Sequence, residues 1–253
     1  LAQSGVHEIV VTGIEIASYG SDLTEDITLP KLMERLLSEN PEVRFRLGSL
    51  EPRIADAEFC ARLRPFPNLA PHFHLSLQSG CDSVLKRMRR RYDTALYREN
   101  ATRLREAFPD CSLTTDLIVG FPGETEAEFL QTLSFIEERA FAAIHVFPYS
   151  VREGTAAARM EGQLPAPLRQ ERAERAKAVA AACGERYRQR FLGRTLPVLL
   201  EHPAGDGLWS GHTAYAFPVY VRADGGNLKN TIHEARLTAL HKNGLLGKPK
   251  DRL

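Results

Sequence analysis

The sequence predicts an α/β protein made of a partial, open barrel of parallel strands, a long linking helix and a small terminal β-barrel. Two observations predict the open barrel. Apolar strand-like segments alternate with amphipathic helical segments over residues 8–147, which is typical of a parallel sheet covered by helices. Within the strand-like segments polar and apolar side chains alternate, so each strand has one polar face. Five such units are too few to close an eight-stranded barrel.

The elements of the open barrel follow from this alternation. We expect strands over residues 8–12, 43–47, 72–78, 113–119 and 143–147, helices over residues 29–39, 56–63 and 126–139, and helical segments across residues 83–107. The start of the last helix is well defined, because Thr125 and Glu128 have the spacing of a capping box. Just before it, the turn at residues 120–123, Gly-Phe-Pro-Gly, lets the backbone approach a ligand closely at the end of a strand.

After residue 154 the pattern changes. We expect one long charged helix beginning near Pro167, and then short strands at TLPVLLEH, LWSGHTA, FPVYVRA and NLKNTIHEARLTAL. These strands suggest a compact β-barrel, a fold that often binds oligonucleotides. The predicted domains are a partial barrel over residues 1–165, a linking helix over residues 166–191 and a β-barrel over residues 192–253.

The polar faces of three strands predict a ligand cavity inside the open barrel. They hold His72, His74, Ser76 and Gln78; Ser112, Thr114 and Asp116; and His145, Phe147 and Tyr149. Packed barrels fill this interior with branched aliphatic side chains, whereas a polar interior must be hydrated or occupied. His72 and His74 share one face, as two metal ligands would, but no third ligand has a characteristic spacing, and we predict no metal site.

Composition describes a globular protein, with 43% hydrophobic and 26% charged residues. No apolar run approaches the ~18 residues that a membrane span needs, and no secretory signal opens the chain. The four cysteines are scattered, without a CxxC or CxxxCxxC motif, which suits a reducing cytoplasm. We therefore expect a cytoplasmic protein that does not contact a membrane.

The formal net charge is only +1, but the basic residues are segregated. Residues 81–105 hold eight Lys and Arg against three Asp and Glu, and residues 190–253 hold nine against five. This distribution suggests a polyanionic partner, although a solvated helix face is the alternative for each run.

Five segments in a fixed order resemble the radical S-adenosylmethionine methylthiotransferases. They are EIVVTGIEIASYG, RFRLGSLEP, HFHLSLQSGCDSVLKRMRRRY, TTDLIVGFPGET and HVFPYSVREGTAA. The terminal barrel resembles the TRAM module that this family appends for RNA binding. The resemblance covers nearly the whole chain, and it implies a partial TIM-like radical SAM barrel followed by a TRAM domain.

The segment LSLQSGCD is similar to the bacterial branch that acts on N6-threonylcarbamoyladenosine beside the tRNA anticodon. It implies a transferase that adds a methylthio group to C2 of that base. The alternatives are the isopentenyladenosine branch, the ribosomal-protein branch and an RNA-binding relative without a cluster. An aldolase-like or phosphate-handling barrel without iron is a further alternative, but it does not explain the order of the five segments.

The resemblance implies S-adenosyl-L-methionine and two [4Fe–4S] clusters as cofactors of the intact enzyme, and tRNA, an electron donor and a sulfur source as partners. The family holds its radical-generating cluster in a CxxxCxxC loop, which is absent from these 253 residues. We therefore expect a fragment that lacks this loop and the amino-terminal domain, is inactive alone, and contains no catalytic or metal-ligating residue.

The resemblance also implies a set of residues around S-adenosylmethionine. It consists of Thr12, Gly13, Ser49, Glu51, Gln78, Ser79, Asp116, Gly120, Phe121, Pro122, Gly123, Phe147 and Tyr149. Thr12 and Gly13 are expected at the methionine end, and Asp116 at a ribose hydroxyl. The turn at residues 120–123 is expected along the adenine.

A second set is implied for RNA. It consists of Lys86, Arg87, Arg89, Arg90 and Arg91 at the mouth of the open barrel, and of His212, Tyr215, Lys229 and Arg236 in the terminal barrel. The family usually has Asn-Tyr near Ala216 and Phe217, where this chain has neither residue.

Overall fold

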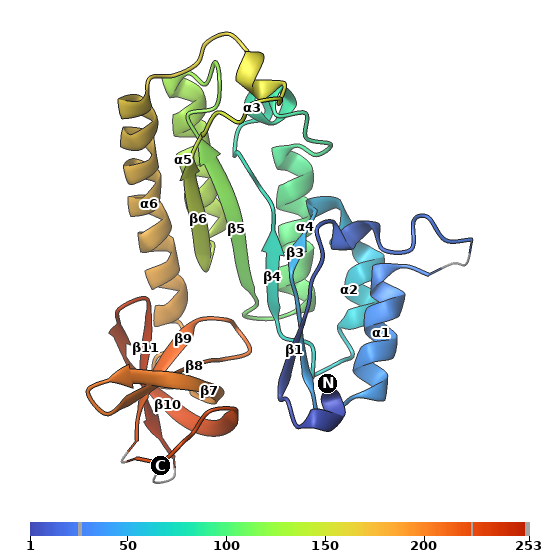
Figure 1. Cartoon of the computed structure of the whole chain (residues 1–253), viewed down its shortest axis with the longest axis vertical. Helices are drawn as coiled ribbons and strands as arrows, with labels where there is room; N and C mark the ends of the chain where they lie inside the picture. The colour runs from blue at the N-terminus through green and yellow to red at the C-terminus, as the bar shows by residue number, and fades with distance from the viewer. Residues whose placement is uncertain (25–26, 224, 251–253) are drawn as a thin grey trace.

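The computed structural model describes residues 1–24, 27–223 and 225–250 (Figure 1). Its first part is a curved, open set of parallel strands. The strands are β1 (Glu8–Val11), β2 (Arg44–Leu47), β3 (Ser49–Leu50), β4 (His72–Leu75), β5 (Ser112–Val119) and β6 (Ala143–Pro148). β1 pairs with β2, and β3, β4, β5 and β6 pair in chain order. Only Gly48 separates β2 from β3, so the two paired groups follow each other around the curve.

Five helices accompany these strands in the described residues. They are α1 (Leu29–Glu39), α2 (Ala57–Leu63), α3 (Asp82–Arg87), α4 (Thr94–Ala107) and α5 (Glu126–Arg139). Their apolar side chains pack on the apolar face of the strands, where Phe73, Leu75 and Leu117 are completely buried. The strand alternation therefore places the polar side chains on the opposite, concave face.

The linking helix is α6 (Ala166–Gln189), and a closed five-stranded barrel follows it. Its strands are β7 (Thr195–Gly205), β8 (Leu208–His212), β9 (Pro218–Arg222), β10 (Thr231–His241) and β11 (Gly244–Pro249). The strand β11 was not among the four strands expected for this barrel. The structure explains Gly244: a Cβ there would lie 2.2 Å from the carbonyl oxygen of Pro218 on the neighbouring strand.

Buried polar contacts join the small barrel to the open sheet. Arg46 on β2 is 7% exposed and donates hydrogen bonds to the carbonyl oxygens of Ala214 (2.9 Å) and Thr213 (3.1 Å). The same guanidinium bonds Glu8 on β1. Tyr187 on α6 donates to the carbonyl oxygen of Asp110, 2.8 Å away. These contacts position the barrel below the concave face of the sheet (Figure 1).

Residues with a positive φ interrupt the chain after α3 and after β4. The helical segments expected across residues 83–107 are the two helices α3 and α4: Arg89 takes a φ of 55° between them, and Asp93 caps α4 through the N–H of Leu96. The strand expected over residues 72–78 ends at Leu75, and Gln78 takes a φ of 66°. Both interruptions shape the upper edge of the sheet. No helix among the described residues is long and apolar enough to cross a membrane.

Candidate functional site

The concave face carries a hydrogen-bonded row of polar side chains. The hydroxyl of Thr114 lies 3.1 Å from both His72 Nε2 and His74 Nδ1. Burial, followed by the charge of Arg46, lowers the pKa of His72 to about 3, so this imidazole is neutral at physiological pH. The expected polar interior is therefore present, and a polar face this extensive has the chemistry of a ligand site.

A cavity of about 600 Å³ lies along β5 and β6, at the carboxyl ends of the strands. Four of the residues implied by the resemblance line it together: Gln78, Asp116, Phe147 and Tyr149. Phe147 is 51% exposed although it is a large apolar side chain, and the buried hydroxyl of Tyr149 has no hydrogen-bond partner. An exposed ring beside an unpaired buried hydroxyl is suited to a ligand that has a flat ring and polar edges.

A second cavity, of about 360 Å³, adjoins the first on the side of β3. Ser49, Glu51 and Gln78 line it, as does Arg90. Gln78 and Arg90 line both cavities, so they stand between them. Sequence reasoning placed Arg90 only among the RNA-binding residues and missed its position at the cavity. The left-handed backbone of Arg89, which no sequence signal announces, turns the chain there.

Several expected cofactor residues do not reach these cavities. Ser79 is completely buried, and its hydroxyl lies 3.2 Å from that of Thr132 on α5. Thr12 and Gly13 follow β1 at the surface and line neither cavity. In the turn at residues 120–123, Phe121 lines a third cavity of about 310 Å³, beside Tyr149 and Arg90.

The glycines of that turn pack against protein. A Cβ on Gly120 would lie 2.6 Å from Cγ of Arg169 on α6, and one on Gly162 would lie 3.1 Å from Gly123. Gly120, Pro122 and Gly123 line none of the three cavities. The expectation that this backbone follows a ligand is therefore not supported by its position, and α6 and the segment before it occupy that side of the turn.

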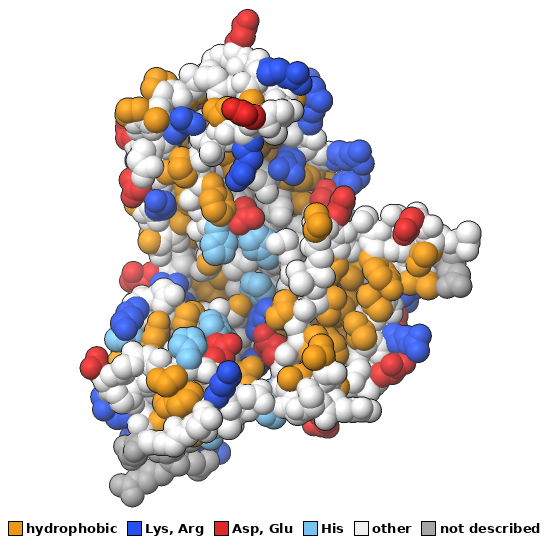
Figure 2. Space-filling view, viewed as in Figure 1, with side chains coloured by type: hydrophobic (Ala, Val, Ile, Leu, Met, Phe, Trp, Pro, Cys, Tyr) orange, Lys and Arg blue, Asp and Glu red, His pale blue; other side chains and the backbone are white. Residues whose placement is uncertain are grey.

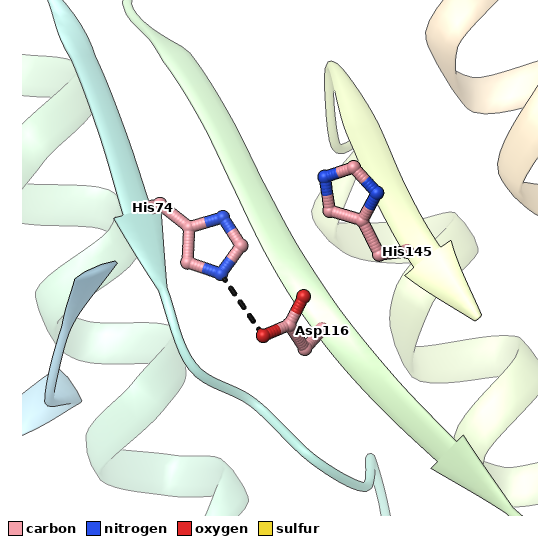
Figure 3. Close-up of side chains that lie close together, drawn as sticks. All are labelled: His74, Asp116 and His145. Atoms are coloured by element: carbon pink, nitrogen blue, oxygen red, sulfur yellow. Dashed lines mark ion pairs between the residues drawn. The ribbon is translucent and has the colours of Figure 1, made fainter. Parts of the chain in front are cut away.

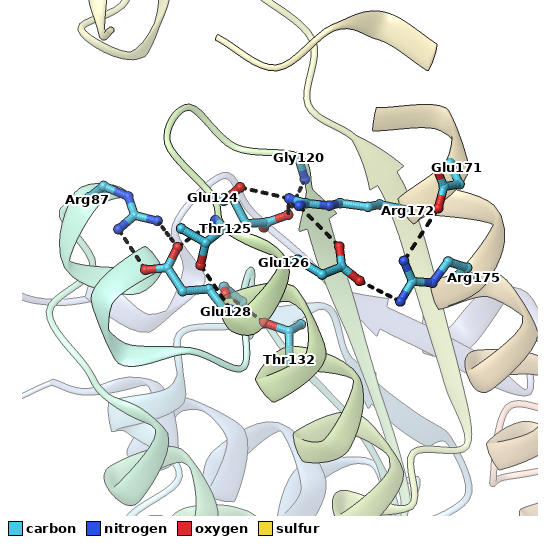
Figure 4. Close-up of polar contacts among 11 residues, drawn as sticks. Arg87, Gly120, Glu124, Thr125, Glu126, Glu128, Thr132, Glu171, Arg172 and Arg175 are labelled. Atoms are coloured by element: carbon cyan, nitrogen blue, oxygen red, sulfur yellow. Dashed lines mark hydrogen bonds and ion pairs between the residues drawn. The ribbon is translucent and has the colours of Figure 1, made fainter. Parts of the chain in front are cut away.

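A buried ion pair that was not predicted from the sequence holds this turn (Figure 4). Glu124 accepts hydrogen bonds from the backbone N–H of Gly120 (2.9 Å) and from Arg172 Nη1 (2.7 Å). The two side chains are 1% and 4% exposed. Burial raises the pKa of Glu124, against the lowering effects of the Gly120 N–H and Arg172. The sequence contained one signal, a glutamate directly after a glycine turn.

The expected capping box is confirmed. Thr125 accepts from the N–H of Glu128, and the Glu128 carboxylate accepts from the N–H of Thr125. Glu128 also binds Arg87 through two hydrogen bonds of 2.8 and 2.9 Å (Figure 4). The hydrogen bond from Arg87, opposed by burial and assisted by Ser83, lowers the pKa of Glu128 to about 2. Arg87 therefore joins α3 to α5 and is not a free cation.

The remaining basic residues differ in how available they are. Lys86, Arg89, Arg90 and Arg91 are exposed around the end of α3, where Figure 2 shows a group of basic side chains. In the barrel, Lys229 and Arg236 are exposed. His212 bonds Glu201, and the ring of Tyr215 packs 4.8 Å from that of Phe191. Tyr215 is therefore half-buried and packs against the barrel core.

The cysteines do not form a cluster site. Cys60, Cys81, Cys111 and Cys183 are all buried, free thiols. Burial raises the pKa of Cys60 to about 11 and that of Cys111 to about 12, which disfavours the thiolates that bind metal. Among the described residues, the one group of His, Cys, Asp and Glu close enough to hold a metal ion contains no cysteine.

Comparison with known proteins agrees with this architecture. A family model described as "Radical SAM superfamily" matches residues 1–136. The chain is 37% identical over 248 residues to the threonylcarbamoyladenosine tRNA methylthiotransferase MtaB of Thermotoga maritima, covering 97% of this chain and 56% of that protein. It is 39% identical over 202 residues to the MtaB of Bacillus subtilis, covering 79% and 45%.

A relative from another branch matches almost as well. The tRNA-2-methylthio-N(6)-dimethylallyladenosine synthase of Syntrophotalea carbinolica is 34% identical over 250 residues, covering 98% of this chain and 57% of that protein. The chain thus spans about half the length of the curated relatives it matches. Among solved structures, the coproporphyrinogen III oxidase HemN of Escherichia coli has a TM-score of 0.51 at 17% identity, covering 74% of this chain and 51% of that one. This last likeness concerns the fold alone.

Proposed function

The chain belongs to the radical SAM superfamily, and from that premise we propose that it acts in the methylthiolation of tRNA. Relatives that share 34–39% of its residues carry names of tRNA methylthiotransferases. The superfamily and these relatives imply S-adenosylmethionine and [4Fe–4S] clusters as cofactors. The finer proposal is that the modified base is N6-threonylcarbamoyladenosine, since two of the three relatives described above are named for it.

The observation that carries the proposal is the polar cavity at the carboxyl ends of the strands. S-adenosylmethionine has an adenine ring, ribose hydroxyls and a charged amino acid end. Phe147 offers an exposed ring face, and the unpaired hydroxyl of Tyr149 and the carboxylate of Asp116 offer polar contacts in the same cavity. These residues fit such a molecule, and they would hold and orient it. When bound, it supplies the radical chemistry that acts on an unreactive C–H bond.

The cysteines of the described residues do not fit the cluster, because they are buried and separate. The residues of this chain instead serve to bind, orient and exclude water. The apolar face behind the sheet keeps the strands rigid, which fixes the relative positions of Gln78, Asp116 and Phe147 around the cavity.

For tRNA, we propose that the exposed cations at the cavity mouth contact phosphates. Lys86, Arg89 and Arg91 are exposed beside it, and Arg90 lines it. Lys229 and Arg236 are exposed in the terminal barrel, and we propose that they contact tRNA phosphates as well, which is the role that the expected TRAM domain would have. Phosphate contacts of this kind make affinity strongly dependent on salt concentration. The electron donor and the sulfur source stay predictions.

The experiment is deletion of the gene in its own host, followed by mass spectrometry of nucleosides from total tRNA. We expect loss of the 2-methylthio form of N6-threonylcarbamoyladenosine, with the unmodified nucleoside accumulating in its place. Re-expression of the wild-type gene should restore the product, and the Asp116→Ala variant should not. Loss of the dimethylallyl product instead would assign the other branch. Unchanged levels of both products would refute the proposal.

A further inference from the structure

We propose that His74, Asp116 and His145 form a site for a divalent transition-metal ion on the concave face of the sheet. The three residues come from the adjacent strands β4, β5 and β6 and point to the same side (Figure 3). One ligand atom from each residue lies within 4.8 Å of those of the other two. The inference does not rest on the proposed function, because it concerns the donor atoms alone.

The strand register explains why these side chains meet. Asp116 is paired with His145 across β5 and β6, and His74 is paired with Thr114, two residues before Asp116. Residues two apart on a strand share a face, so all three donors lie on the polar side. His72 belongs to the same row, but its Nε2 bonds Thr114, and it is not part of the group.

The environment of His74 suits a bound cation. Its Nδ1 is hydrogen-bonded to Thr114 Oγ1 at 3.1 Å, which leaves Nε2 as the second donor atom. Nε2 is buried, has no hydrogen-bond partner, and lies 3.4 Å from Oδ2 of Asp116. When Nδ1 carries the proton, the lone pair of Nε2 faces a carboxylate. A metal ion between the two atoms would satisfy both, and Thr114 would then be the outer-shell partner that fixes the tautomer.

The distances suit a small metal ion. Zinc lies about 2.0–2.2 Å from imidazole nitrogen and carboxylate oxygen, so two ligands of a tetrahedral shell are about 3.3 Å apart. The separation of 3.4 Å between His74 and Asp116 already matches this value. His145 is exposed on β6, the outermost strand of its sheet, so its side chain is free to approach the other two.

The donor set and its position suggest the kind of site. Two imidazoles and one carboxylate bind zinc, iron(II) or cobalt(II) in preference to calcium or magnesium. Asp116 also lines the cavity of about 600 Å³, so a bound ion would keep its remaining positions open toward that space. Three protein ligands with an open position are typical of sites where a metal contacts a substrate or water. The competing interpretation is a plain His74–Asp116 ion pair.

The test uses Co²⁺ alone as the probe. The purified chain is stripped with a chelator and titrated with Co²⁺ while d–d absorption is recorded, and bound metal is counted by elemental analysis after dialysis. We expect one ion per chain, and we expect His145→Ala and Asp116→Asn each to weaken binding by about 100-fold, since the first removes an imidazole ligand and the second removes the charge of the carboxylate ligand. His145 is exposed, so its replacement leaves the core unchanged.

The matched control is His212→Ala. His212 bonds Glu201 in the terminal barrel, so it is another imidazole–carboxylate pair but lies outside the group. This variant should bind Co²⁺ like the wild type. The proposal is overturned if the wild type binds no Co²⁺ at 100-fold excess over protein, if His145→Ala binds as well as the wild type, or if His212→Ala loses binding equally. Circular dichroism of each apo variant confirms that it is folded.

Discussion

Replacing Arg172 with leucine should destabilise the protein strongly, because it leaves the buried carboxylate of Glu124 without its counter-ion. Arg172 bonds both the side chain and the backbone carbonyl of Glu124, at 2.7 and 2.9 Å. The two side chains are 4% and 1% exposed, so water cannot replace the guanidinium. Removing one partner of a buried ion pair costs about 3–5 kcal/mol. For a chain of this size that corresponds to a fall in Tm of roughly 6–20 °C.

The destabilisation by Arg172→Leu should depend on pH, which distinguishes the loss of a counter-ion from a simple loss of packing. Burial raises the pKa of Glu124, and losing Arg172 removes a group that lowers it. A carboxyl group whose pKa is higher in the folded than in the unfolded state binds more protons when folded. Acidification therefore stabilises the folded Arg172→Leu variant relative to wild type, and this gain is lost as the pH rises through the folded pKa. The loss in free energy of unfolding of Arg172→Leu relative to wild type should be largest near pH 8 and smaller near pH 5.

The assay is thermal and denaturant unfolding of both proteins between pH 5 and 8. Arg175→Leu is a matched control, because Arg175 lies three residues later on α6 and its guanidinium carbon lies 4.7 Å from the ring centre of Phe129. Arg175 is 36% exposed and pairs with Glu126, so its loss should cost less than about 1 kcal/mol at any pH. A deficit below about 1 kcal/mol for Arg172→Leu, or one that does not change with pH, would refute the reasoning.

Two further predictions concern α5 and its contacts. Glu128→Gln should reduce the loss in free energy of unfolding that acidification causes. The pKa of Glu128 is lowered to about 2, chiefly by Arg87, so the stability that its carboxylate contributes is complete above its ordinary pKa of 4.5 and is lost as the pH falls toward 2. An equal loss of free energy of unfolding in the variant and the wild type on acidification would contradict this. Gly80→Ala should cost about 1–3 kcal/mol in denaturant unfolding, because its Cβ would lie 2.7 Å from Cβ of Phe135. Gly13→Ala, whose Cβ would meet nothing closer than 3.9 Å, is the control and should be nearly neutral.

Much of the fold was predictable because it depends on local periodicity. The alternation of strand and helix patterns predicted the strands β1, β2, β4, β5 and β6 and the helices between them, but not the two-residue strand β3; the helix Glu126–Arg139 was predicted to the residue. That helix has a start signal that is entirely local, the capping box of Thr125 and Glu128. The interruptions at Gln78 and Arg89 were not predictable, because neither residue is one that usually takes a positive φ.

For the candidate site, the sequence determined which faces are polar, since the alternation along a strand is fixed by backbone geometry. It placed Gln78, Asp116, Phe147 and Tyr149 on that face, and the structure brings all four to one cavity. Tertiary structure decided which polar groups meet. Strand register pairs Asp116 with His145, and α6 returns to bury Glu124 against Arg172, 48 residues away in the sequence. Such contacts join distant segments, and no pattern within a single segment specifies the register or packing that creates them.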